Sequence, residues 1–202
     1  MYYSQRILGI KKMSSDLLET LNDNVKVINF IKSRPLNARL FHSLCESVGS
    51  EHTQLLLHTE VRWLSRGRIL ARLFELRDEV GSFLLQHGSH LSTLFENSAW
   101  LAQLAYLADI FGKLNELNLS LQGINTNILN LYDKVGGFQK KIELWKELCS
   151  EGEFACFPMS EAYLSGNNVE RETVTPIIVE HLTNLICAFE KYFPKMHEIC
   201  AA

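Results

Sequence analysis

The feature that most constrains this chain is an apolar repeat of seven residues that runs from Leu107 to Cys149. One set of apolar residues recurs every seven positions, and a second set follows its members by three. The two sets are Leu107, Leu114, Leu121, Ile128, Val135, Ile142 and Cys149, and Ile110, Leu117, Ile124, Leu131, Phe138 and Trp145. This spacing is typical of a helix seam packed along a partner helix. It predicts one long helix, over about residues 98–149, with Gly136-Gly137 as its weakest point because glycine disfavours helix by about 1 kcal/mol.

Shorter signals predict further helices. Apolar residues recur at helical spacing over residues 16–32 and 37–48, where Pro35 ends the first helix and Gly49 caps the second. Ser65 fits the N-cap of a helix that reaches about Gln86. A last helix starts at Thr175, with Pro176 in its first position.

The remaining stretches complete an all-α prediction. Residues 150–173 have the glycine, proline and asparagine content of a loop. A small β remnant is the most that we expect, near the N-terminus and around residues 54–58. The predicted organisation is a lead-in over residues 1–13, followed by one elongated helical domain over residues 14–202.

Composition narrows the classes of function. Hydrophobic residues make up 47% of the chain and charged residues 21%, which is ordinary for a globular protein. The formal net charge of −3 gives no general attraction for nucleic acid, so any DNA contact must come from a local patch. No stretch approaches the roughly 18–20 apolar residues of a membrane span. The 5 cysteines have no C-x-x-C pair and indicate free thiols, and hence a nuclear or cytoplasmic protein.

No pattern in the sequence predicts an enzyme, a metal site or a bound cofactor. His87 and His90 have the spacing H-x-x-H, but they lie in a turn-like segment without a further ligand. The sequence has no G-x-S-x-G motif and no glycine loop that would cradle a phosphate. The carboxylates are expected on the solvent faces of helices: Asp16, Glu19, Asp23, Glu46, Glu75, Asp78, Glu79, Asp109 and Glu116.

The segment around Arg62 and Trp63 allows two interpretations. The tryptophan could pack into the core where an extended segment meets a helix, with the arginine paired to a carboxylate. Alternatively, an exposed indole could hold an unstacked base, beside an arginine that holds a phosphate. The surrounding basic cluster of Arg62, Arg66, Arg68, Arg72 and Arg77 is either a solvated helix face or a phosphate-contacting patch.

Two runs in this region carry a family resemblance. Residues 32–41 read K-S-R-P-L-N-A-R-L-F, and residues 58–67 read H-T-E-V-R-W-L-S-R-G, with the pattern T-x-x-R-W-x-S inside the second run. Together they resemble hAT-type DNA transposases, and in particular the domesticated copies carried by animal proteins with BED-type zinc fingers. The matching segment in such transposases joins a ribonuclease-H-like catalytic domain to its helical insertion. The resemblance implies DNA contacts for Arg62 and Trp63, and we extend the tentative surface to Ser65, Arg66 and Arg68.

The resemblance also implies what this chain lacks. Active hAT transposases hold two metal ions with three carboxylates, and no segment here resembles the surroundings of those carboxylates. The family motif C/D-x-x-H aligns with Met1 and Ser4, so neither of its ligands is kept. We therefore expect a fragment that keeps the insertion region but lacks the catalytic residues, the BED finger and the C-terminal dimerisation region.

The resulting expectation is a non-catalytic, transposase-derived interaction module that binds a protein partner through helical surfaces and retains weak DNA binding. Two alternatives remain at this point: a DNA-binding accessory protein associated with transcription, and a protein that self-associates through the repeat of residues 107–149. Helices 16–32 and 37–48 would pack on the catalytic core of a full transposase, so their apolar faces are candidates for exposure. No small-molecule substrate is expected.

Overall fold

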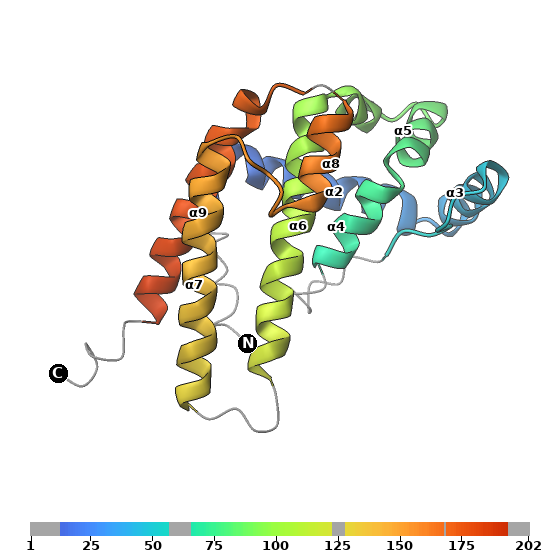
Figure 1. The fold of residues 1–202 in the computed structure, drawn as a ribbon. Coiled ribbons are helices and arrows are strands. Elements are labelled where there is room, and N and C mark those ends of the chain that lie inside the picture. Colours follow the sequence, from blue (N-terminus) through green and yellow to red (C-terminus); the bar gives the residue numbers. More distant parts are fainter. Residues whose placement is uncertain (1–12, 57–65, 123–127, 168, 194–202) are drawn as a thin grey trace.

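The central element of the fold is a long apolar helix, α6 (Ser98–Leu121). The structure of the chain is a computed structural model, which describes residues 13–56, 66–122, 128–167 and 169–193. Helices α2, α4, α7, α8 and α9 all contact α6, which therefore lies at the middle of the molecule (Figure 1). Within the described residues the regular elements are helices and no strand occurs. The all-α prediction is confirmed, and residues 54–56 are not a strand.

The single helix predicted over residues 98–149 is wrong. The chain instead forms α6 and α7 (Ile128–Ser150), which run side by side in opposite directions (Figure 1). The repeat suggested one helix because α6 and α7 each place their repeat positions against the same core: Leu107 and Ile142 are both fully buried. In the middle of the repeat the pattern does not correspond to burial, since Ile128 is 71% exposed. The repeat is thus an internal seam, and not a surface that pairs two chains.

The helix predicted from Ser65 to about Gln86 is two shorter helices. Helix α4 spans Arg66–Glu75 and α5 spans Arg77–Gln86. Leu76 separates them with φ −94° and ψ 21°, and its side chain is buried. This turn lets α4 pack on α6 while α5 packs on α3 and on the short 3-10 helix η3 (His90–Glu96). No glycine or proline lies at the turn, and the apolar pattern continues across it. The sequence therefore predicted one helix where the structure has two.

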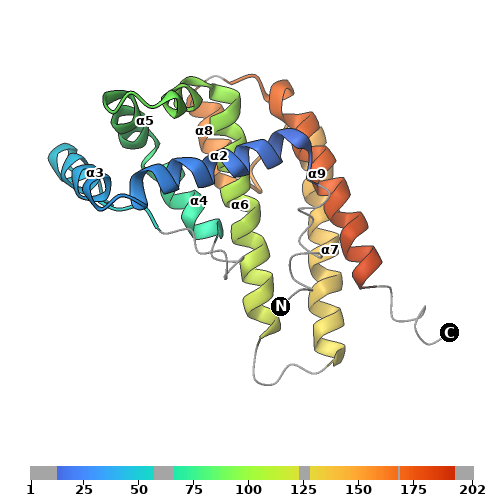
Figure 2. The same ribbon diagram turned by 180° about the vertical axis from the view of Figure 1, so that it is seen from behind.

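The two N-terminal helices were predicted closely. Helix α2 spans Ser15–Lys32, and its N-cap is Ser14, whose hydroxyl accepts a hydrogen bond from the amide of Leu17. Helix α3 spans Pro35–Val48 and ends at Gly49, which has the left-handed φ of 74° that glycine adopts without strain. Figure 2, the view from behind, shows that α2 crosses in front of α6 on that side and that α3 lies at the edge of the molecule.

The C-terminal part contains a helix that the sequence did not reveal. Helix α8 (Pro158–Gly166) lies inside the stretch predicted as a loop and packs on α6. Helix α9 (Arg171–Tyr192) begins before the predicted start at Thr175, so Pro176 lies inside the helix. It packs along α7 and ends before Pro194, as predicted. No helix in the described part of the chain is both long and apolar enough to cross a membrane.

Candidate interaction surfaces

One uncovered apolar feature of the described chain is on α3. Leu36, Leu40, Leu44 and Val48 follow one another at intervals of four residues, which places them along one line of the helix surface. We call these four residues the α3 ridge. Leu36, Leu40 and Val48 are 59%, 44% and 60% exposed, and Leu44 is half-buried against the core. The α3 ridge is therefore an apolar strip of helix that the described part of the chain leaves largely open to solvent.

The neighbouring line of α3 explains why the ridge stays uncovered. Asn37, Phe41 and Cys45 are buried, and they attach α3 to the rest of the molecule. The side-chain amide of Asn37 donates to the carbonyl of Phe30, 2.9 Å away. The ring of Phe41 meets the edge of Phe83 with centroids 5.5 Å apart. Among the described helices only α2 and α5 contact α3 to any extent, so one side of its apolar surface has no described helix to cover it.

The predicted DNA surface is only partly described. Arg62, Trp63 and Ser65 lie outside the described residues, so the two interpretations of the Arg62-Trp63 segment remain untested. Arg66 and Arg68 form the first turn of α4. Arg66 is half-buried and lines a small cavity with α2 residues such as Leu21, whereas Arg68 is exposed.

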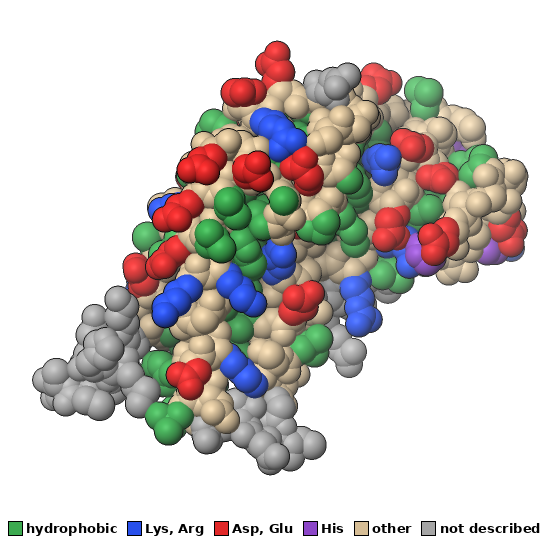
Figure 3. All heavy atoms as spheres, in the orientation of Figure 1, with side chains coloured by type: hydrophobic (Ala, Val, Ile, Leu, Met, Phe, Trp, Pro, Cys, Tyr) green, Lys and Arg blue, Asp and Glu red, His purple; other side chains and the backbone are tan. Residues whose placement is uncertain are grey.

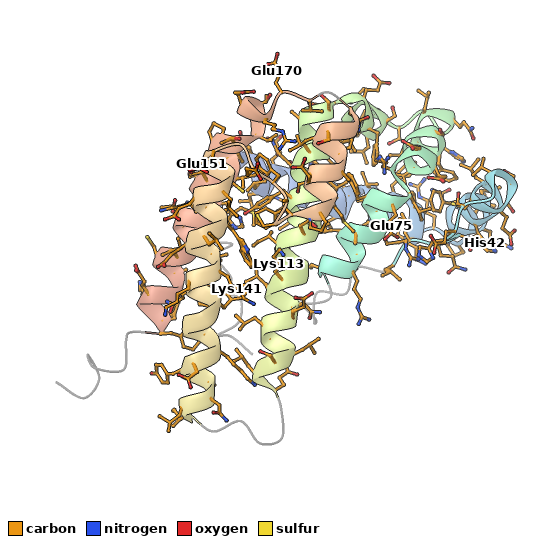
Figure 4. The ribbon with its side chains drawn as sticks, in the orientation of Figure 1. His42, Glu75, Lys113, Lys141, Glu151 and Glu170 are labelled. Atoms are coloured by element: carbon orange, nitrogen blue, oxygen red, sulfur yellow. The ribbon has the colours of Figure 1, made fainter. Side chains whose placement is uncertain are left out.

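Two members of the predicted arginine cluster have structural contacts. Arg72 donates a hydrogen bond from Nε to the carboxylate of Glu75, 3.0 Å away, and a second one from its guanidinium group to the carbonyl of Gln54. Glu75 is labelled in Figure 4. Arg77 donates to the carbonyl of Phe74 at 3.0 Å, and its guanidinium carbon lies 4.8 Å from the centre of the Phe74 ring. The contacts of Arg77 join α4 to α5, and those of Arg72 lie within α4 and reach the segment that contains Gln54. Among the described arginines of the cluster, Arg68 is the exposed one that a phosphate could contact.

A glycine in the same motif has a packing role that the sequence analysis missed. A Cβ atom on Gly67 would lie 2.8 Å from the amide nitrogen of Gly112 and 2.9 Å from the carbonyl carbon of Phe111. The missing side chain therefore lets the first turn of α4 approach the backbone of α6. In this part of the motif the packing residue Gly67 is thus flanked by Arg66 and Arg68.

A second basic area lies along α6 and α7. Figure 3 shows Lys and Arg side chains over the lower part of these helices and acidic side chains above them. Lys113 and Lys141 face the strip between the two helices (Figure 4). The ammonium group of Lys113 lies 4.7 Å from the centre of the Trp145 ring, which is a stabilising cation–π distance. Glu116, Asp133 and Glu143 lie among these lysines in the sequence, so this area is most simply a solvated helix face.

A buried polar contact joins two helices that are distant in the sequence, α6 and α9. The hydroxyl of Tyr106 lies 2.8 Å from Nδ1 of His181, and both side chains are buried. Burial lowers the pKa of His181 to about 4 and raises that of Tyr106. No hydrogen-bond partner for Nε2 of His181 occurs among the described residues. With the ring and the phenol this deeply buried, the pair has no route to a substrate and acts as a contact between α6 and α9.

Asp109 corrects one expectation, because it is buried and not on a solvent face. Its carboxylate accepts hydrogen bonds from the amide and hydroxyl of Ser160, at 3.0 and 2.9 Å, and from the amide of Met159. The carboxylate lies at the N-terminus of α8, where it accepts hydrogen bonds from the free amide groups and interacts favourably with the positive end of the helix dipole. Burial raises the pKa of Asp109, and the hydrogen bonds from α8 oppose that change. Asp23, which was expected on a solvent face, is also buried, and it pairs with Lys26 at 2.7 Å.

The cysteines are free thiols where the structure describes them, namely at Cys45, Cys149, Cys156 and Cys187. Cys149 and Cys156 share a hydrogen bond, which together with burial raises the pKa of Cys149. The same hydrogen bond lowers the pKa of Cys156, and burial opposes that change. Burial raises the pKa of Cys45 to about 11. Within the described ranges, no three side chains of His, Cys, Asp or Glu come together in a group that could hold a metal ion.

Comparison with known proteins gives one family. Residues 4–150, well over half of the chain, match the family model for the FAM200/GTF2IRD2 helical domain. The match includes α2–α7 and all the residues of the α3 ridge and of the predicted DNA surface. No solved structure matches the chain.

Proposed function

Because the chain belongs to the FAM200/GTF2IRD2-like family, a family related to domesticated transposases, we propose that it is a non-catalytic interaction module. The single observation that carries the proposal is the α3 ridge. Three of its four apolar side chains are between 44% and 60% exposed on a well-formed helix. A folded chain with a covered core gains nothing from an open apolar strip, so such a strip marks a surface for another macromolecule.

The proposal also assigns the chain to the hAT group of transposases and places it in the nucleus or cytoplasm. The runs K-S-R-P-L-N-A-R-L-F and H-T-E-V-R-W-L-S-R-G support the hAT assignment. The family model that matches this chain describes a helical domain, which supports a role without strand cleavage. The relation to proteins with BED-type zinc fingers follows from the same two runs.

Catalysis is tested directly with the purified chain. It would be incubated with supercoiled plasmid and with hairpin-ended DNA, in Mg²⁺ and in Mn²⁺, and nicks and strand-transfer products would be counted. We expect no product above that of a heat-inactivated sample. Metal-dependent nicking that copurifies with the folded chain would contradict the proposal.

A second candidate function, sequence-tolerant DNA binding, is favoured by Arg68. This arginine is exposed at the first turn of α4, directly after the Arg62-Trp63 segment. DNA binding at this surface should weaken steeply with salt, because each phosphate contact releases counterions. The measurement is a salt series of the dissociation constant for single-stranded and hairpin-ended DNA.

The matched variants for that series are Trp63→Ala, Arg68→Ala and Arg77→Ala. Arg77 serves as the control because its guanidinium is held by the carbonyl and ring of Phe74. If the surface binds DNA, Trp63→Ala and Arg68→Ala should weaken binding by about tenfold while Arg77→Ala leaves it within twofold. Equal effects of the three variants, or no binding at low salt by a folded chain, would rule this candidate out.

A further inference from the structure

Two cysteines lie next to each other where α7 leads into α8. Cys149 is the last residue but one of α7 and is fully buried, and Cys156 lies two residues before α8 and is half-buried. Their thiols share a hydrogen bond, which places the two sulfur atoms side by side. We propose that this pair is a site of reversible oxidation, at which a peroxide converts the two thiols into a disulfide. The modification goes beyond the proposed interaction module and does not depend on it.

The chain between the two cysteines reverses in a tight turn. Gly152 has a left-handed φ of 81°, and its amide donates to the carbonyl of Cys149, 3.0 Å away. The amide of Glu153 donates to the carbonyl of Leu148 at 2.9 Å. These two bonds are those of a helix end capped by glycine. Phe154 then enters the core, where it is fully buried, so the chain returns towards the end of α7 directly after leaving it.

Aromatic contacts hold the residues that flank the pair. Trp145 lies one helical turn before Cys149 on the same face of α7, and Phe157 directly follows Cys156. The centroids of these two rings are 5.8 Å apart. Phe157 also meets the ring of Tyr106 on α6, at 5.1 Å. Because the fold already holds the two cysteines together, a bond between them costs little further conformational freedom.

The two cysteines differ in access and in charge, which assigns their roles. A small oxidant can reach the half-buried Cys156, whereas Cys149 has 0% exposure. The hydrogen bond from Cys149 lowers the pKa of Cys156, and the ammonium group of Lys113 acts in the same direction. Burial and the nearby carboxylate of Asp109 oppose this change. The thiolate is the reactive form of cysteine, so Cys156 is the thiol that meets the oxidant.

The reaction has two steps. The thiolate sulfur of Cys156 attacks one oxygen of hydrogen peroxide, the O–O bond breaks, and a sulfenic acid forms on Cys156. The departing hydroxide takes up the proton that Cys156 had released and becomes water. The sulfur of Cys149 then attacks the sulfenic sulfur, the S–O bond breaks, and the hydroxyl leaves as a second water with the thiol proton of Cys149.

The electrons balance across the two steps. The two thiols together lose two electrons and gain one S–S bond, and the peroxide gains two electrons and yields two waters. A thiol reductant reverses the modification by thiol–disulfide exchange.

The test uses the purified, reduced full chain and a small molar excess of hydrogen peroxide. We expect the loss of two free thiols and of the mass of two hydrogen atoms, both restored by dithiothreitol. A protease that cleaves after glutamate locates the bond, because Glu151 and Glu153 lie between the two cysteines. Without reductant, peptides 148–151 and 154–161 should appear joined. This result needs no variant, so it does not depend on how a substitution folds.

Variants separate the two roles, in a chain that also carries Cys187→Ser and Cys200→Ser. With Cys156→Ser, oxidation of Cys149 should slow at least about tenfold, because its thiol is buried. With Cys149→Ala, Cys156 should still react but stop at the sulfenic acid, which dimedone traps as an adduct. Cys45 is the internal control, since it is buried and its pKa is raised to about 11, and it should stay reduced throughout. Circular dichroism establishes that each variant is folded.

The exposed Cys187 of the unaltered chain provides the decisive comparison. We expect the joined peptides to form several times faster than Cys187 is oxidised, because Cys156 has the lowered pKa. Oxidation of Cys187 that leaves Cys149 and Cys156 as thiols would overturn the proposal. So would joined peptides that form only after the chain is unfolded in urea.

Discussion

The α6–α9 bundle and α3 are built from similar amphipathic patterns but reach different degrees of burial. In the bundle, α6 is in contact with helices on several sides, and the repeat positions Leu107, Ile110 and Ile142 are fully buried. Helix α3 contacts mainly α2 and α5, and three side chains of its ridge, two leucines and one valine, are 44–60% exposed. An apolar pattern therefore indicates which side of a helix can be buried, and the number of neighbouring helices determines what fraction of that side is buried.

This difference bears on the sequence-based expectations for the two regions. The repeat of residues 107–149 was a candidate surface for pairing two chains, and most of its positions are buried inside one chain. The apolar face of helix 37–48 was a candidate for exposure, and α3 carries the open strip. The predictions below test whether the contrast in packing is also a contrast in energy.

The largest effect is expected from two matched leucine truncations. Leu107→Ala removes a side chain with 0% exposure and should cost about 2–5 kcal/mol of unfolding free energy. Leu40→Ala removes one that is 44% exposed and should cost less than about 1 kcal/mol. Urea unfolding measures both. Similar losses at the two positions would mean that the contrast in burial has no energetic counterpart.

A close contact between α4 and α6 gives the next prediction. Gly67→Ala should destabilise the chain by about 3 kcal/mol, because the added Cβ meets backbone atoms of Phe111 and Gly112 that cannot rotate away. Gly136→Ala in α7 is the control, since its Cβ would meet nothing within 4 Å. That variant should gain up to about 1 kcal/mol from helix propensity. Thermal unfolding of both variants checks the pair, and a tolerated Gly67→Ala would show that the two helices pack less closely.

The buried histidine of the bundle should make the chain sensitive to mild acid. The pKa of His181 is lowered to about 4 in the fold from an ordinary value of 6.5, so the unfolded chain takes up a proton that the folded chain refuses. The stabilisation is complete above pH 6.5 and is lost as the pH falls towards 4. From pH 7 to 5.5 the unfolding free energy should fall by about 1 kcal/mol from this group.

The matching control is His181→Gln, which removes the titrating group and keeps a polar side chain near the hydroxyl of Tyr106. Its unfolding free energy should vary less between pH 7 and 5.5 than that of the unaltered chain, as measured by urea unfolding at each pH. The same pH dependence in both proteins would show that another group is responsible.

The smallest effect concerns local opening. Cys45 in α3 and Cys149 in α7 both have 0% exposure, so a thiol reagent reaches either one only after part of the fold opens. With fewer neighbours around α3, Cys45 should be labelled several times faster than Cys149 in the native chain. Mass spectrometry of alkylated peptides measures both rates, with the exposed Cys187 as the reference for rapid labelling. Equal protection of Cys45 and Cys149 would mean that α3 opens only with the whole molecule.

Local signals predicted the elements with strong end markers. Pro35 and Gly49 bound α3, and the stretch from residue 15 to 32 follows a regular apolar period, so these helices were predicted closely. Helix α8 could not be predicted because its first turn depends on Asp109, which is about 50 residues earlier in the chain. The turn at Leu76 depends likewise on where α3 and α6 lie.

The candidate surfaces show the same limit. An exposed apolar face on α3 was expected from the resemblance, but which of its side chains are exposed is a property of the assembled fold. The arginine cluster was visible in the sequence, but only the structure separates Arg72 and Arg77, which have partners of their own, from the exposed Arg68. The role of Gly67 required the position of α6.

The contact of Asp109 with α8 has a consequence for the order of folding. The donors on Met159 and Ser160 gain this carboxylate only once α6 is formed and in place. A nine-residue helix is too short to persist alone in water. We therefore expect α8 to form late and to open early, which makes the segment that leads into it the first site for a protease.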